Sequence, residues 1–199
     1  MQLSPIVLAT TFALVLPAEL PDKTMFTTLL LATRYRPLPV LLGVASAFAV
    51  QCVVAVAFGS VLTLLPGRIV ALVTALLFTI GAVLLLRQGF GAGHEQTPNV
   101  GDGNGAAPWR RAAAVSFGML FAAEWGDASQ LATAALTARY DDPVSVGLGS
   151  WLALVVVGTL AVLVGKGFAD RFPTTWLQRI AGAIFAVFAV LAGAAALFG

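Results

Sequence analysis

Residues 17–31 read PAELPDKTMFTTLLL, and residues 122–136 read AAEWGDASQLATAAL. Each stretch carries a glutamate and an aspartate three residues apart in otherwise apolar surroundings, namely Glu19 and Asp22 in the first and Glu124 and Asp127 in the second. One offset of 105 positions superimposes the two pairs. The match predicts an internal repeat. The role of the acids depends on the environment in which these segments lie.

The rest of the chain is strongly apolar. Of its 199 residues, 59% are hydrophobic and only 10% are charged. Runs of 18 residues or more carry no charge at all, for example 37–67 and 69–86. Runs of this length match the apolar core of a bilayer, which is about 30 Å thick. The composition therefore predicts an all-α integral membrane protein.

Turn and charge signals divide the chain into six expected helices. These span residues 3–33, 38–65, 67–87, 110–138, 145–167 and 175–198. The stretch 89–108 is Gly-rich and polar, lacks apolar periodicity and is predicted to be a linker. We therefore expect a first three-helix repeat at 1–88 and a second at 109–199.

The repeat extends beyond the acids. At the same offset, residues 12–35 share eight identities with residues 117–140. Because each repeat has an odd number of spans, the second repeat must enter the membrane upside down relative to the first. The expected fold is thus six transmembrane helices arranged as two inverted three-helix repeats, a plan common among transporters that places the site near the midplane.

The distribution of basic residues predicts the orientation. Eight of them fall on the side of the first, third and fifth connections: Arg34, Arg36, Arg87, Arg110, Arg111, Lys166, Arg171 and Arg179. Only Arg68 and Arg139 fall on the other side. The positive-inside rule then predicts a multi-pass protein of the cell (plasma) membrane, with both termini outside and the central linker in the cytoplasm.

The four acids within predicted spans point to cation binding. An ionisable group at the centre of a membrane helix costs about 2.5–3.5 kcal/mol on insertion scales, so such groups mark functional sites. Four carboxylates in a medium of low dielectric need protons or a cation as counter-charge. Clustered oxygen atoms suit hard divalent ions. Competition between protons and a metal for these carboxylates is the simplest basis for proton-coupled antiport.

The residues beside the acids fit such a site. Pro21 and Gly126 occupy equivalent positions and weaken the two helices that carry the acids. Broken helices at membrane depth are tolerated where they line a cavity. The further candidate ligands come in matched pairs: Thr24 with Ser129, and Met25 with Gln130. Lys23 is expected either to neutralise Asp22 or to act in gating or coupling.

The two acidic motifs also resemble a known family. ELPDKT at 19–24 and EWGDASQ at 124–130 resemble the two copies of the E-x-G-D-[KR]-[ST] signature of the MneA/Gdt-type cation exporters. Pro21 stands in place of the glycine of the first copy, and Ala128 in place of the basic residue of the second. The resemblance covers nearly the whole chain and implies a six-helix exchanger of Mn²⁺ or Ca²⁺ for protons.

The expected function is therefore a secondary transporter that exports divalent cations, Mn²⁺ first and Ca²⁺ second, in exchange for protons. The alternative is a six-helix exporter of another cationic substrate, such as a basic amino acid. An intramembrane aspartyl protease using Asp22 and Asp127 is disfavoured, because glycine precedes only the second of them. We expect no enzyme activity, no nucleic-acid partner and no cofactor besides the transported ion; the expected partners are that ion, protons and the lipid bilayer.

Overall fold

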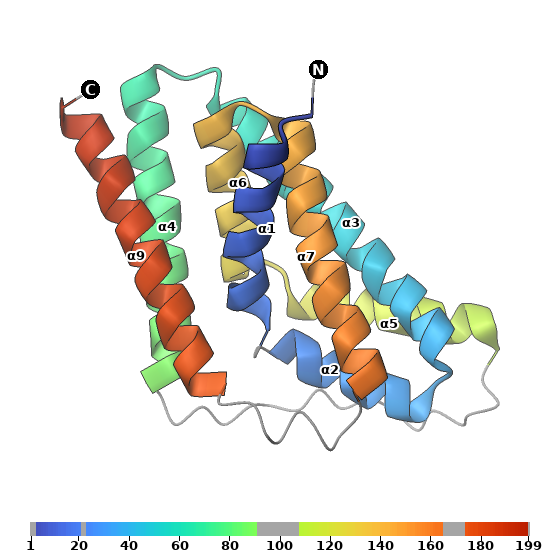
Figure 1. The fold of residues 1–199 in the computed structure, drawn as a ribbon. Helices are drawn as coiled ribbons and strands as arrows, with labels where there is room; N and C mark the ends of the chain where they lie inside the picture. The colour runs from blue at the N-terminus through green and yellow to red at the C-terminus, as the bar shows by residue number, and fades with distance from the viewer. Residues whose placement is uncertain (1–2, 21–22, 91–107, 165–173, 199) are drawn as a thin grey trace.

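The computed structural model describes residues 3–20, 23–90, 108–164 and 174–198. The regular structure of these residues consists of eight helices (Figure 1). Their bounds are Pro5–Glu19 (α1), Lys23–Arg34 (α2), Pro37–Leu62 (α3), Gly67–Phe90 (α4), Trp109–Ala123 (α5), Ala128–Tyr140 (α6), Pro143–Val164 (α7) and Thr174–Phe198 (α9). The all-helical class predicted from the sequence is confirmed for this part of the chain.

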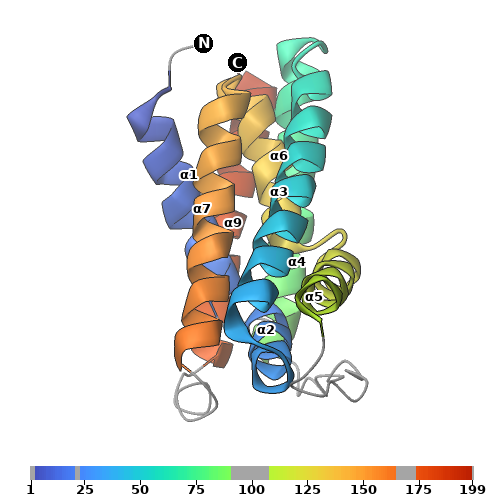
Figure 2. The same ribbon diagram turned by 90° about the vertical axis from the view of Figure 1, so that its right-hand side faces the viewer.

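Four of the described helices are long and apolar enough to cross a membrane. These segments are Pro37–Leu62, Gly67–Arg87, Pro143–Leu163 and Arg179–Leu197. In the ribbon, α4 packs along α9 and α3 packs along α7 (Figures 1 and 2). The shorter helices α1 and α6 lie between these two pairs. The chain is thus a membrane protein with a bundle of apolar helices.

The segments predicted over 3–33 and 110–138 each contain two helices, in keeping with the weakening expected at Pro21 and Gly126. In the first half α1 ends at Glu19 and α2 begins at Lys23, while residues 21 and 22 lie outside the described part. In the second half α5 ends at Ala123 and α6 begins at Ala128. Gly126 lies in this break with a φ of +77°, a conformation that strains any residue with a Cβ atom. Both helices therefore break at the acidic motif.

The two breaks differ in their geometry. Helix α5 lies across the bundle and is seen nearly end-on in Figure 2, whereas α1 runs along it. The beginning of α1 and the end of α9 lie at the same end of the bundle as the turn between α3 and α4 (Figure 1). The end of α1 and the beginning of α6 meet about halfway along the bundle, which positions the acids there.

The two halves repeat one close helix contact. A Cβ atom on Gly43 in α3 would clash with the carbonyl group of Ala113 in α5. A Cβ atom on Gly149 in α7 would lie 2.6 Å from the carbonyl oxygen of Leu8 in α1. The two glycines are 106 positions apart and their partners 105 positions apart. Small residues let helix backbones approach closely in membranes, and here the same device is used twice.

One aromatic contact joins equivalent positions of the two halves. Phe78 in α4 and Phe185 in α9 are 107 positions apart, and both are fully buried. Their ring centroids lie 5.5 Å apart in an edge-to-face arrangement. The pair therefore joins α4 of the first half to α9 of the second.

The start of α7 is held by a capping interaction that gives a testable pH effect. Asp142 directly precedes α7 and accepts a hydrogen bond from the backbone N–H of Ser145, with 3.1 Å between Oδ1 and N. The hydroxyl of Ser145 also donates to this carboxylate, and together these bonds hold the pKa of Asp142 below its ordinary value. The backbone N–H of Ser4 donates to the Ser145 oxygen at 2.8 Å, which ties the start of α1 to that of α7.

We expect Asp142→Ala to lower the free energy of unfolding at neutral pH by about 0.5–1 kcal/mol, the low end for an N-terminal cap because solvent screens the carboxylate. Since the folded pKa is lowered, this contribution is present above the pKa of the unfolded chain and is lost as pH falls through the folded value. Thermal unfolding in detergent between pH 7 and pH 3 measures it. The difference between wild type and Asp142→Ala should vanish at the acidic end; a constant difference contradicts the role of the charge.

Candidate metal site

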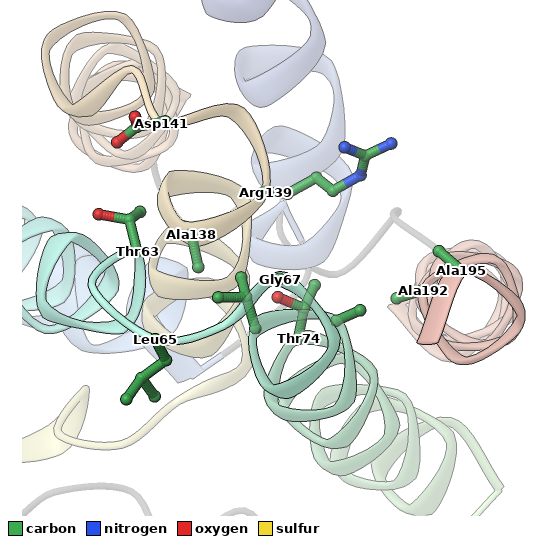
Figure 3. Close-up of a pocket in the computed structure, with 11 residues that line it drawn as sticks. Thr63, Leu65, Gly67, Thr74, Ala138, Arg139, Asp141, Ala192 and Ala195 are labelled. Carbon is green, nitrogen blue, oxygen red and sulfur yellow. The ribbon is translucent and has the colours of Figure 1, made fainter. Parts of the chain in front are cut away.

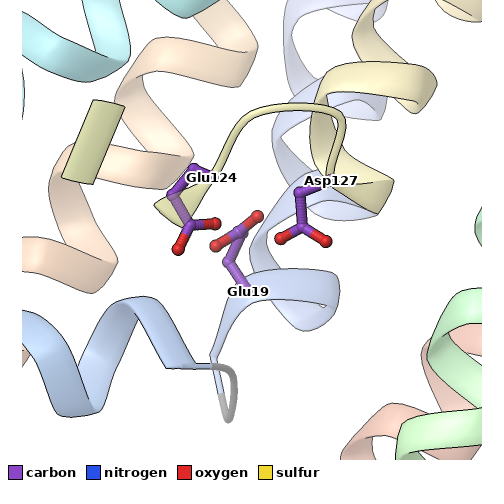
Figure 4. Close-up of side chains that lie close together, drawn as sticks. All are labelled: Glu19, Glu124 and Asp127. Atoms are coloured by element: carbon purple, nitrogen blue, oxygen red, sulfur yellow. The ribbon is translucent and has the colours of Figure 1, made fainter. Parts of the chain in front are cut away.

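Three buried carboxylates meet where the broken helices come together. Glu19 is the last residue of α1, Glu124 follows the end of α5, and Asp127 precedes α6. Each offers an oxygen atom, and these atoms all lie within 4.8 Å of one another (Figure 4). The three residues are only 1%, 3% and 6% exposed, respectively. The structure thus brings together three of the four predicted acids.

The spacing of these oxygens suits a single ion. Calcium–oxygen bonds in proteins measure about 2.3–2.6 Å, so two oxygens on opposite sides of one ion lie up to roughly 5 Å apart. The 4.8 Å limit of the acid group falls within that span. One divalent cation can therefore contact all three carboxylates.

The ends of α1, α5 and α6 add partial charges to the surroundings of the three acids. Aspartate at a helix N-terminus usually caps the helix with its own side chain, but Asp127 makes no such capping bond to α6. Its carboxylate points to those of Glu19 and Glu124 instead (Figure 4). The positive end of the α6 dipole then lies beside the acids, while the last turns of α1 and α5 present carbonyl oxygens. Both features occur at ion sites formed by discontinuous membrane helices.

Part of the predicted site in the first half falls outside the described residues. Asp22 belongs to this part, so the fourth carboxylate has no described position. Lys23 and Thr24 form the beginning of α2, but their side chains are also outside the described part. The backbone of α2 nevertheless starts at Lys23, four residues after Glu19.

Met25 and Gln130 occupy equivalent positions but different surroundings. Met25 is buried in an apolar cluster that includes Val157 of α7. Gln130 accepts a hydrogen bond through its side-chain oxygen from the backbone N–H of Gly126, at 2.8 Å. The amide thereby holds the break between α5 and α6 in shape. Ser129 is buried and lines a small cavity next to Gln130.

Gln51 is a polar residue of this region that the sequence analysis missed. It lies in α3, is buried, and donates a hydrogen bond from Nε2 to the carbonyl oxygen of Phe121 in α5, at 3.1 Å. Gln51 also lines the small cavity with Ser129, Gln130 and Thr133. It is the only side-chain amide in the apolar run 37–67, and that signal was available in the sequence.

A larger cavity opens at the end of the bundle where the termini lie. It has a volume of about 460 Å³ and is lined by residues of the α3–α4 turn, α4, the end of α6 and α9 (Figure 3). Thr74 of α4 lines it, and Phe78 follows one turn later within the apolar core. Helix α6 leads from Asp127 at the acid group to Arg139 at this cavity. The part of α6 between these two residues includes Ala132, Ala135 and Leu136 of the apolar core.

The chain is similar to transport proteins along nearly its whole length. The profile of a family described as "Divalent cation/proton antiporter GDT1" matches residues 7–93 and 112–198. The "GDT1-like protein sll0615" of Synechocystis sp. is 31% identical over 196 residues, which cover 89% of this chain and 92% of that protein. The "Putative manganese exporter" of Vibrio cholerae is 30% identical over 188 residues, which cover 92% and 88%, respectively. "GDT1-like protein 3" of Arabidopsis thaliana is 27% identical over 202 residues, which cover 92% and 69%. No solved structure gives a significant match.

Proposed function

Because this chain belongs to the GDT1 family of divalent cation/proton antiporters, we propose that it exports Mn²⁺ from the cell in exchange for protons and accepts Ca²⁺ as a second substrate. As a member of that family it is a transporter and not an enzyme, and its substrates are a divalent cation and protons. The name of the relative from Vibrio cholerae supports manganese as the first ion to test.

The observation that carries the proposal is the buried group of Glu19, Glu124 and Asp127. These carboxylates can bind either protons or one divalent cation, and the binding of one weakens the binding of the other. Loading the ion therefore expels protons, and protonation expels the ion. This competition couples the two fluxes without any nucleotide.

We propose that Asp22 is the fourth carboxylate, because the repeat pairs it with Asp127. The proposed neighbouring ligands are Thr24, Ser129, Gln130 and Met25. Gln130 lies at the break and Ser129 in the adjoining cavity, which supports their inclusion. Met25 packs against apolar residues, so its sulfur is the weakest candidate of the set. Lys23, at the start of α2, is the proposed coupling residue.

The proposed architecture is two inverted repeats of three spans, at 1–88 and 109–199, joined by the linker 89–108. In this arrangement α1 with α2 forms one span, and α5 with α6 forms its counterpart. The repeated glycine contacts, the Phe78–Phe185 pair and the two matches of the family profile support the assignment. The beginning of α1 and the end of α9 lie at the same end of the bundle in Figure 1, which supports an even number of membrane crossings.

The proposed location is the plasma membrane, with the linker in the cytoplasm and both termini outside. A cysteine in place of Gly101 tests this orientation, after Cys52, the only native cysteine, is replaced by alanine. We expect a membrane-impermeant maleimide to label it in inverted vesicles or lysed cells but not in intact cells. A cysteine in place of Gln2, near the N-terminus, is the matched control and should label in intact cells. The opposite pattern refutes the orientation.

Transport in inverted membrane vesicles tests the function itself. With an acidic lumen, we expect Mn²⁺ uptake driven by the pH gradient and accompanied by proton release from the lumen. Collapse of the gradient with a protonophore should stop uptake. A panel of Mn²⁺, Ca²⁺, Mg²⁺ and lysine separates a divalent-cation exchanger from an exporter of basic amino acids. Proton flux driven by lysine but by none of the metals contradicts the proposal.

A further inference from the structure

One of the positions at which the two halves of the protein differ lies against the broken helices. Gln51 in α3 and Val157 in α7 are 106 positions apart, the same offset that relates Gly43 to Gly149. Val157 is buried in an apolar cluster that includes Met25 and is packed by Leu16 of α1. Leu16 is in turn the equivalent of Phe121, the residue whose carbonyl group Gln51 contacts. An apolar contact in one half is thus replaced by a hydrogen bond in the other.

This hydrogen bond lies at the end of the helix that carries Glu124. A helix leaves its last carbonyl groups without amide partners from a following turn. Helix α5 ends at Ala123, and the N–H of Glu124 still bonds back to the carbonyl oxygen of Leu120. Gln51 supplies a donor from another helix to the next carbonyl along, that of Phe121, at 3.1 Å. The end of α5 is therefore fixed to α3 only three residues before Glu124.

The surroundings of Gln51 can satisfy the rest of its amide. A side-chain amide has two N–H donors and one oxygen acceptor. The cavity that Gln51 lines has a volume of about 10 Å³ and includes Ser129, Gln130 and Thr133. A polar cavity of about this size can hold one water molecule. A buried amide in this place can therefore be satisfied.

We propose that Gln51 is a positioning residue of the cation site: it holds the end of α5, and through it the carboxylate of Glu124, in place for the ion. The inference rests on the proposed function for its effect on transport, but its effect on α5 is independent of that function. It also makes the second half of the site the rigid half, because the first half has valine at this position. Gln51 does not need to touch the ion.

Gln51→Met tests the role, because methionine matches glutamine in length and lacks the donor. In proteoliposomes we expect the KM for Mn²⁺ to rise about five- to tenfold, the scale of one ordinary hydrogen bond, with the maximal rate changed less. By hydrogen exchange without any metal, we expect the amides of residues 121–127 to exchange faster. The equivalent segment at the end of α1, residues 16–20, should be unchanged. Gln51→Asn, whose amide is one carbon short, should show the same exchange effect and replaces Gln51→Met if that variant does not fold.

Cys52→Ala is the matched control, because Cys52 lines the same cavity from the next position of α3. We expect its KM and its exchange at 121–127 to stay close to wild type. Equal effects in Cys52→Ala and Gln51→Met would assign the role to packing, and unchanged exchange in Gln51→Met would overturn the inference. If the wild-type protein moved no divalent cation, the proposed function would fail while the exchange measurement still decided the role of Gln51.

Discussion

Glu19→Gln, Glu124→Gln and Asp127→Asn should each reduce Mn²⁺ transport by more than about 100-fold, while the protein still inserts and folds. Each change removes one carboxylate from a group whose oxygens lie within 4.8 Å of one another, and leaves the side-chain volume almost unchanged. Mutation of a residue that only hydrogen-bonds to a metal ligand already costs roughly 10–100-fold in metal affinity or activity. Loss of a direct ligand that also carries the exchanged proton should cost more.

The measurement is pH-driven Mn²⁺ uptake in vesicles, normalised to the amount of folded protein. Asp141→Asn is the control, because it makes the same chemical change at an exposed acid at the end of α6. Asp141 has a φ of 50°, a left-handed conformation that asparagine adopts readily, so this variant should transport like wild type. Near-normal uptake in any two of the three site variants contradicts a site built on these carboxylates.

The second large effect is expected at the two glycines that let α5 and α1 approach their neighbours. Gly43→Ala and Gly149→Ala should each destabilise the protein by about 1–3 kcal/mol, the range for overpacking a close contact. The reason is that a Cβ atom at either position meets a backbone carbonyl group, which cannot swing away as a flexible side chain does. Leucine at either position should prevent folding.

Gly118→Ala and Gly118→Leu are the matched controls. Gly118 lies in α5, as does Ala113, the residue that Gly43 approaches. A Cβ atom at Gly118 would meet nothing within 4 Å. Both controls should fold, and the alanine variant should gain slightly, because glycine is a poor helix former. Thermal unfolding in detergent and the yield of monodisperse protein report the outcome. Equal behaviour of Gly43→Ala and Gly118→Ala contradicts the proposed close packing.

The sequence was sufficient to predict the acid group, because the signal did not depend on distant contacts. Charged residues are rare in apolar helices, and one offset related both pairs. Glu19, Glu124 and Asp127 are indeed brought together. The positions of the breaks were also marked, by Pro21 and Gly126, but the sequence did not show how the helices on either side of each break are oriented. Whether a weak point bends or breaks a helix depends on packing around it, which the local sequence does not contain.

The direction of α5 and the role of Gln51 could not be predicted for a related reason. In a soluble helix, apolar periodicity shows which face is buried, but the long helices α3, α4 and α7 are apolar on both faces. Small residues indicate where two helices pack closely in a membrane. The partners of Gly43 and Gly149 could be identified only from the structure. Gln51 stood out as an amide in an apolar run, but its partner Phe121 is 70 positions away along the chain.

The contact between Phe78 and Phe185 bears on how the proposed exchanger would move. Inverted repeats change access when one repeat rocks against the other around the site. In the proposed inverted repeat, two equivalent rings that touch in one state would also touch after the two halves exchange conformations. Their contact can therefore persist throughout the cycle, in the manner of a fulcrum. The segments that open and close access to the site would then lie away from these two rings.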